Sequence, residues 1–175
     1  CLTEMERGSL NGRSHKLFAL SAIDRAIMAL LSNIHGSKEA KPSRYRATKQ
    51  EKEEEFAQKI QLAVSYWNAV SNFIPDWQLV LQKQVAAGEI RRDCVHCHSV
   101  VLESLGEVGA SLLSAFPESW EERLSLLQQV DWSISNPDWE GGILVKGRVS
   151  RSRASVIWMT DYLKKRLGLG TADAA

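Results

Sequence analysis

The chain has 175 residues, of which 44% are hydrophobic and 25% are charged; this composition suits one globular domain with a sizeable core and excludes a largely disordered chain. Its formal net charge is only +1 at pH 7, so any attraction to nucleic acid or to an anionic membrane has to come from local patches. The three cysteines do not make a disulfide framework, and no run approaches the roughly 18 apolar residues that span a bilayer.

These features predict a soluble protein of a reducing compartment, which we take to be the cytoplasm, without a membrane partner. Because the first residue is Cys1 and not methionine, we expect that the true beginning of the protein has been lost or processed away. The absence of a signal peptide is therefore uninformative.

The recurring period along the chain is helical, which predicts an all-α domain of about six helices. The first helix is expected over residues 17–34, where Ser21 and Asp24 are spaced as a capping pair and Gly36 follows the end. Its predicted inward stripe is Leu20, Ile23, Ile27, Leu30, Leu31 and Ile34.

The stretch from Ser37 to Lys49 carries five positive residues and one negative residue, with Pro42 in its middle, and predicts a solvated basic loop. Thr48 and Glu51 then have the spacing of a capping box. They precede the longest predicted helix, whose apolar positions are Phe56, Ile60, Ala63, Val64, Trp67, Val70 and Ile74.

Pro75 predicts the start of a further helix that Gly88 closes, and Pro117 predicts another start before Trp120. Between them a helix is expected to run to Phe116 and to include the stretch "RRDCVHCHSVVLESLG". A long loop or short hairpin containing Trp132 and Trp139 should cover the core before a last helix over residues 154–167. We expect residues 1–170 to form one helical domain and residues 171–175 a flexible tail.

Within that stretch, Cys94, Cys97 and His98 match the CxxCH pattern of covalent haem attachment. A haem site also needs a second axial ligand, for which Met159 is the only obvious partner further along the chain. Zinc would need a fourth ligand such as His35 or His96, and structural zinc sites usually join two separate ligand pairs. We therefore favour buried cysteines and a hydrogen-bonded core histidine on a helix, with no metal and no cofactor.

Three stretches resemble a known family: "GRSHKLFALSAIDRAIMALL", "HSVVLESLGEVGASL" and "DWSISNPDWEGGILVKGRVSRSRASVIWMTDYLKKRLGL". They are similar to segments of DndB-like DNA sulfur modification proteins, the DGQHR-domain group. In that pattern His98, an apolar pair and LG recur, whereas the cysteines do not, so the CxxCH match looks accidental. The DGQHR sequence itself is absent, and the resemblance implies that this chain is the C-terminal helical part of a longer protein.

The resemblance implies a DNA-binding transcriptional regulator encoded with bacterial DNA phosphorothioation genes, and not the sulfur-transferring enzyme. Its expected partners are double-stranded DNA, the missing N-terminal domain, and a second copy or other proteins of the same system.

Local basic clusters are the candidate DNA contacts, because cationic side chains neutralise phosphates. The favoured cluster precedes the last helix, whose N-terminal amides also favour an anion. The candidate residues are Lys146, Arg148, Arg151 and Arg153, then Arg13 and Lys16, and Arg44 and Arg46 in the basic loop.

A solvated surface is the alternative interpretation of these clusters, and a non-catalytic protein-interaction scaffold of the same system is the alternative function. Catalysis is not expected. Glu121 and Glu122 are neighbours that point apart on a helix, and no spacing places a nucleophile beside its base.

Overall fold

The computed structural model describes residues 2–5, 10, 14–34 and 49–170. The part of the predicted basic loop before Lys49 and the predicted tail at residues 171–175 lie outside these residues. Helices dominate the described chain, which confirms a mainly α fold. None of the helices in the described ranges is long and apolar enough to cross a membrane.

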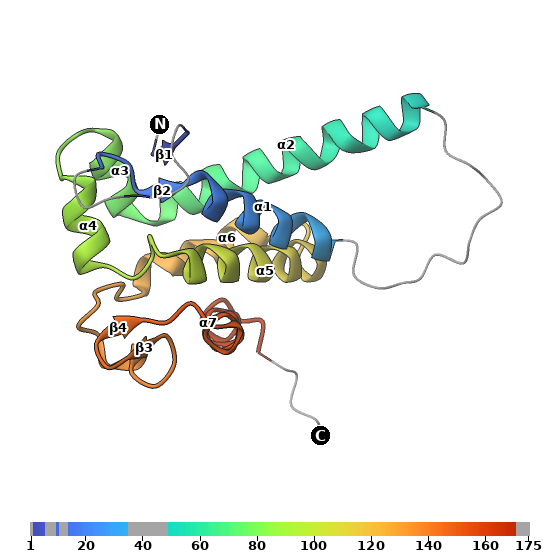
Figure 1. Ribbon diagram of the computed structural model, residues 1–175. Coiled ribbons are helices and arrows are strands. Elements are labelled where there is room, and N and C mark those ends of the chain that lie inside the picture. Colours follow the sequence, from blue (N-terminus) through green and yellow to red (C-terminus); the bar gives the residue numbers. More distant parts are fainter. Residues whose placement is uncertain (1, 6–9, 11–13, 35–48, 171–175) are drawn as a thin grey trace, which may run out of the picture.

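The described residues form seven α-helices and four two-residue strands, whose arrangement is shown in Figure 1. The helices are α1 (Leu20–Ile34), α2 (Lys49–Phe73), α3 (Pro75–Leu81), α4 (Ala87–Asp93), α5 (Ser99–Ala115), α6 (Trp120–Leu124) and α7 (Arg153–Arg166). Two short 3-10 helices, η1 (Ser125–Gln129) and η2 (Pro137–Trp139), follow α6. Strand β1 (Thr3–Glu4) pairs in parallel with β2 (Phe18–Ala19), and β3 (Leu144–Val145) pairs antiparallel with β4 (Arg148–Val149).

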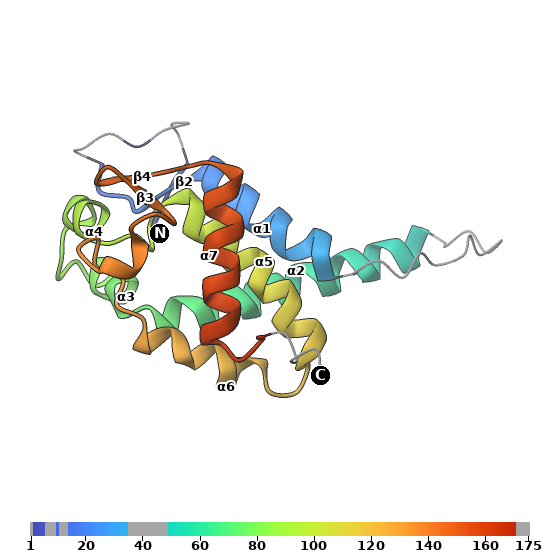
Figure 2. The same ribbon diagram turned by 90° about the horizontal axis from the view of Figure 1, so that it is seen from below.

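Helix α5 is the centre of the fold, with α1 on one side and α7 on the other (Figures 1 and 2). The side of α1 that faces α5 is its small-residue side, on which Ala22, Ala26 and Leu30 are buried. A Cβ added at Gly106 of α5 would lie 2.3 Å from the backbone oxygen of Ala26. Glycine at this position therefore permits a close approach of the two helices.

The predicted inward stripe of α1 is partly wrong. Leu20 is 42% exposed, and Ile23 and Ile27 are only partly buried. The helix also begins at Leu20, so Ser21 lies inside its first turn and not at the predicted cap. The reason is that alanine and glycine allow the closest packing, so the large apolar residues fall on the neighbouring face.

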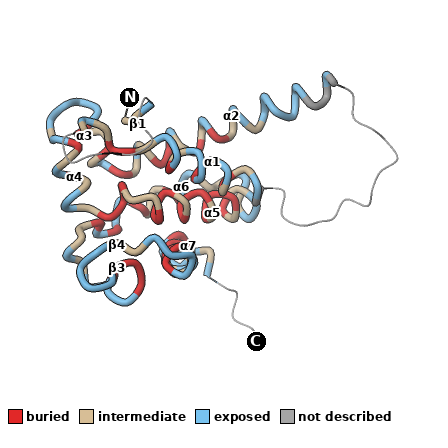
Figure 3. Tube along the Cα trace, viewed as in Figure 1, coloured by how far each residue is buried: buried red, intermediate tan, exposed pale blue. Residues whose placement is uncertain are grey.

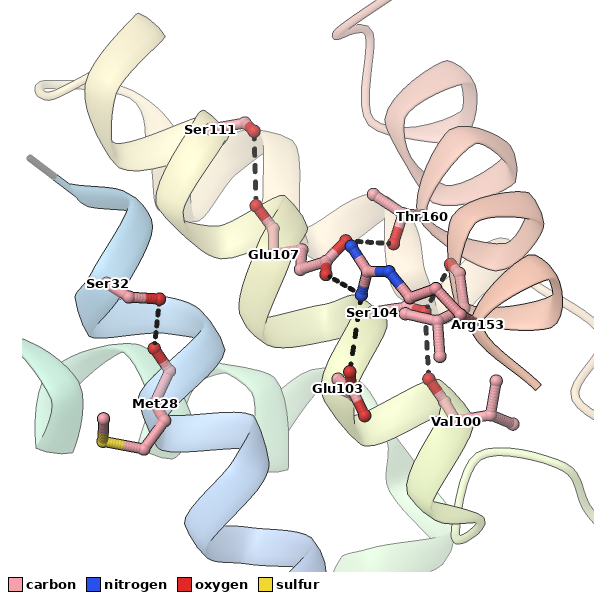
Figure 4. Close-up of polar contacts among 10 residues, drawn as sticks. Met28, Ser32, Val100, Glu103, Ser104, Glu107, Ser111, Arg153 and Thr160 are labelled. Carbon is pink, nitrogen blue, oxygen red and sulfur yellow. Dashed lines mark hydrogen bonds and ion pairs between the residues drawn. The ribbon is translucent and has the colours of Figure 1, made fainter. Parts of the chain in front are cut away.

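Polar groups join α5 to α7 (Figure 4). The buried Ser104 hydroxyl lies 2.9 Å from the carbonyl oxygen of Val100 and 3.0 Å from that of Val156, within hydrogen-bond distance of both. Glu107 accepts a hydrogen bond from Thr160 at 3.0 Å and pairs with Arg153 at 2.6 Å. These contacts fix the start of α7 against α5.

Helix α2 is the longest helix, as predicted, but only its C-terminal half is packed. The Tyr66 hydroxyl there is buried and donates a hydrogen bond to the carbonyl of Leu105 at 2.6 Å. The N-terminal half extends away from the body (Figures 1 and 3), and residues 53–58 on it are exposed. Phe56 and Ile60, two of the apolar positions from which the helix was predicted, are 65% and 46% exposed.

Pro75 does start a helix, but two other boundaries differ from the prediction. Helix α3 ends at Leu81, and Lys83 then adopts a left-handed conformation with φ of 59°. Gly88 therefore lies within a separate helix, α4, and does not close the preceding one. Residues Cys94–His98 form the connection between α4 and α5, so the prediction that they lie on a helix is wrong.

Candidate nucleic-acid interface

The β3–β4 hairpin presents basic side chains on a tight turn. Lys146 and Gly147 occupy the two central positions, with φ of 53° and 71°. Two left-handed residues are what a type I′ turn requires, and this turn matches the twist of the two strands that it joins. All four residues from Val145 to Arg148 are exposed.

The base of the hairpin is buried. Ile143 is fully buried, and its carbonyl accepts a hydrogen bond from the Ser150 backbone N–H at 2.8 Å. Gly142 lies against the indole of Trp158, where an added Cβ would be 2.4 Å from the ring. Trp139 in turn packs edge-on against Trp158, with ring centroids 6.3 Å apart. The exposed turn therefore stands on a rigid support.

The four candidate residues from Lys146 to the first residue of α7 divide into two groups. The side chains of Lys146, Arg148 and Arg151 are exposed and form no hydrogen bond or ion pair with the described part of the chain. Arg153 instead pairs with Glu107 at 2.6 Å and lies 3.5 Å from Glu103. Its charge is therefore partly neutralised by α5.

The N-terminus of α7, which was expected to favour an anion, is already capped. The Ser152 hydroxyl oxygen accepts a hydrogen bond from the Ser155 backbone N–H at 3.1 Å. This serine cap satisfies one of the free amides of the first turn. The nearby charged side chains, and not the helix end, are thus the main attraction for an anion.

Lys16 is linked to Arg151 through Arg91 of α4 and His98 of the α4–α5 connection. The Arg91 guanidinium donates hydrogen bonds to the backbone carbonyls of Ser14, at 3.0 Å, and Lys16. The His98 ring is hydrogen-bonded to the Arg91 backbone and interacts electrostatically with Arg151. Arg13, Arg44 and Arg46 lie outside the described residues.

His98 is a neutral member of this neighbourhood. Burial lowers its pKa below the usual value, and the positive charge of Arg151 lowers it further, while the hydrogen bond with the Arg91 backbone partly offsets both effects. Its Nε2 atom is buried and has no hydrogen-bond partner in the described part of the chain. His98 therefore adds no positive charge to the surface near neutral pH.

His96 is a second hydrogen-bonded histidine, and it is fully buried, whereas the predicted His98 is only partly buried. The Trp77 indole N–H donates to Nδ1 of His96 at 3.0 Å, and Nε2 lies 2.9 Å from a carboxylate oxygen of Asp76. Because Nδ1 accepts a hydrogen bond from Trp77, Nε2 carries the ring hydrogen and donates a hydrogen bond to Asp76. The hydrogen bond from His96 holds the pKa of Asp76 below its usual value.

The same contacts favour a structural cluster over a metal site. Donor atoms of Asp76, Cys94 and His96 lie within 4.8 Å of one another. However, the His96 lone pair is used by Trp77, and Nε2 is protonated, so the ring has no lone pair for a metal. Burial raises the pKa of Cys94 to about 11 and that of Cys97 to about 12. These thiols are therefore protonated in the metal-free chain at neutral pH, and a metal would have to displace the Sγ proton to bind them.

Sequence reasoning missed the residues that connect and support this surface. Arg91 was overlooked because its role depends on backbone carbonyls more than 70 positions earlier. Trp158 was not assigned a function because an indole on a helix predicts only burial. The sequence does contain one signal for the hairpin support. Gly142 leaves room for an aromatic ring, and the following helix supplies one, Trp158.

Comparison with known proteins gives one match. The model of the DndB family, described as DNA-sulfur modification-associated, matches residues 1–170. No curated protein and no solved structure matches the chain significantly.

Proposed function

Because the chain belongs to the DndB family, which is associated with DNA sulfur modification, we propose that it is a DNA-binding transcriptional regulator of that system. Its partner is double-stranded DNA, and it acts in the cytoplasm without a cofactor. The observation that carries the proposal is the exposed basic hairpin, whose cations have no counter-charge in the described part of the chain.

The electrostatics favour a local contact. With a net charge of +1, the whole protein does not attract DNA strongly, so binding depends on where positive charge is concentrated. Lys146 and Arg148 stand on a protruding turn, and Arg151 follows directly after it. Two-stranded β-ribbons can enter a DNA groove, and basic side chains on such a ribbon reach the phosphates on either side.

Arg153 has a smaller part in this proposal. Its pair with Glu107 has to weaken before its guanidinium can approach a phosphate. Lys16 is connected to this surface through its backbone carbonyl, which accepts a hydrogen bond from Arg91, and the Arg91 backbone is hydrogen-bonded to His98.

A second candidate function is a non-catalytic interaction scaffold of the same system. It is favoured by a separate observation, the exposed apolar side chains of α2, among them Phe56 and Ile60.

We propose no catalytic role for either candidate. The Asp76–His96 pair lacks a free ring nitrogen to act as a base, because Trp77 occupies it.

The test is binding of the purified chain to a fluorescent duplex from the promoter of its own operon, with and without phosphorothioate. A double variant, Arg148→Ala with Arg151→Ala, should weaken binding by at least about tenfold, because two charge-assisted phosphate contacts are lost. Lys164→Ala with Lys165→Ala removes the same charge from the far end of α7 and should change affinity much less.

Equal losses in the two double variants would show that only total charge matters and would contradict the assignment to the hairpin. Failure of the unmodified chain to bind either duplex at low salt would contradict the regulator proposal. The scaffold function would then be favoured.

A further inference from the structure

An apolar groove of about 490 Å³ runs between α1 and α2. Ile23, Ile27 and Leu31 of α1 form one wall, and Ile60, Val64 and Trp67 of α2 form the other. Among the residues that the structure describes, no charged side chain lines it. A groove of this kind between two helices suits the apolar face of a third helix.

The same helix that forms one wall also carries an exposed apolar ridge. Phe56, Ile60 and Val64 are spaced by four residues and therefore lie in one row along α2. Their exposed fractions are 65%, 46% and 49%. Phe56 belongs to the N-terminal half of α2, which extends away from the body (Figure 1), and the α2 wall of the groove begins at Ile60.

We propose that the groove binds the projecting half of α2 from a second copy of this chain. The two α2 helices would run antiparallel about a two-fold axis near Ile60. The ridge is symmetric about that residue, so Phe56 of each copy would lie against Val64 of the other. Each copy would thus supply both the inserted helix and the groove, which gives a closed two-fold dimer.

The exposed area is large enough for such a dimer. Phe56, Ile60, Val64 and Leu81 are 44–65% exposed. Together with the half-buried groove walls, they present on the order of 500 Å² of apolar surface per copy, given about 150–250 Å² for each aromatic side chain and somewhat less for the aliphatic ones. Two copies would bury about 1,000 Å², which is near the lower bound for a specific interface.

This face is separate from the proposed DNA contact. The groove lies on the α1 side of α5, whereas the hairpin lies on the α7 side (Figure 1). Dimerisation through α2 therefore leaves both hairpins exposed. The inference does not depend on DNA binding, and it is tested without DNA.

The test is the mass of the chain in solution, measured by sedimentation or light scattering over a concentration series. The account predicts twice the 19.6 kDa of one chain at about 100 μM, where even a micromolar Kd gives mostly dimer. Ile60→Glu should yield monomer, since it places two carboxylates face to face on the axis. Phe56→Ala should weaken association by at least about tenfold, because it removes the most exposed side chain of the ridge.

Gln58→Glu is the matched control. Gln58 is exposed and lies about 200° around the helix from Ile60, so the same added charge falls on the opposite face. This variant should dimerise like the unmodified chain. Circular dichroism and thermal unfolding of each variant separate loss of association from loss of fold.

A monomeric unmodified chain at these concentrations would overturn the proposal. An Ile60→Glu variant that dimerises as strongly as the unmodified chain would also overturn it. If Gln58→Glu weakened dimerisation as much as Ile60→Glu does, the proposal would also be overturned, because the interface would then not lie on the ridge.

Discussion

Helix α1 contacts its two helical neighbours in different ways. Toward α5 it presents Ala22, Ala26 and Leu30, of which none is more than 7% exposed. Toward α2 it presents isoleucine and leucine side chains that border an open groove. Small side chains on α1, with Gly106 opposite them, let α1 and α5 approach closely.

The two sides of α1 therefore have different roles: the side that faces α5 stabilises the fold, and the side that borders the groove is available for binding. The close α1–α5 contact excludes water completely around Leu30, which has no exposed surface. The residues on the other side remain accessible and can bury further area only against a partner. Substitutions on the α5 side should therefore change the free energy of unfolding, and substitutions on the groove side should mainly change association.

The largest expected effect is that of Leu30→Ala, which leaves a closed cavity beside α5. It should reduce the free energy of unfolding by about 2–5 kcal/mol. Ile27→Ala, on the groove side, should cost only about 1 kcal/mol, because water can fill the space and less area is lost. Urea unfolding of both variants at low protein concentration measures the difference. Similar losses would mean that the two sides of α1 are equally packed.

Gly106→Ala tests the close approach itself. The new methyl group would meet the backbone of Ala26, so one helix has to move, and we expect a loss of about 2 kcal/mol. Ser114→Ala, an exposed position on the same helix, should change stability by only a few tenths of a kcal/mol. A gain of about 1 kcal/mol for Gly106→Ala, as helix propensity alone predicts, would contradict the packing.

Asp76→Ala tests whether polar contacts also hold the core. It would leave the protonated Nε2 of the fully buried His96 without an acceptor, at a cost of about 1–2 kcal/mol. Asp93→Ala removes an exposed carboxylate that pairs with the exposed Arg92, and its effect should be clearly smaller. Thermal unfolding of the two variants provides the comparison. Equal decreases in Tm would show that the Asp76–His96 contact stabilises the fold no more than the exposed Arg92–Asp93 pair does.

The smallest expected effect is a pH dependence from His98. Its pKa is lowered in the folded chain, so below about pH 6.5 the unfolded state binds more protons and stability falls as the pH falls. His98→Gln cannot titrate and should lose less stability between pH 7.5 and 5.5, which urea midpoints at both values can measure. An identical decline in the variant would assign the pH dependence to other groups.

The long helices could be predicted from the sequence because their apolar residues recur with the helical period. The start of α3 at Pro75 and the inward residues of α7, such as Met159 and Leu163, follow from the same reasoning. The inward side of α1 could not be predicted, because Ala22 and Ala26 have the same period as the isoleucines. Only the position of Gly106, 80 residues after Ala26, decides between the two sides.

The candidate site was predictable only in part. Basic residues around Gly147 predict an exposed turn, and Lys146 and Arg148 lie on one. The pairing of Arg153 depends on Glu107, which is 46 positions away, and no local pattern indicates it. Likewise, nothing in the spacing of His96 and His98 shows which ring meets Asp76 and Trp77.

The central claim is that the basic hairpin binds DNA phosphates, and the most direct test is the salt dependence of duplex binding. For a protein that neutralises Z phosphates, the slope of log Kobs against log salt is about −0.9Z. Arg148→Ala with Arg151→Ala should make this slope shallower by about 1.8, whereas Lys164→Ala with Lys165→Ala should leave it unchanged. An identical slope for the hairpin variant and the unmodified chain would contradict the claim.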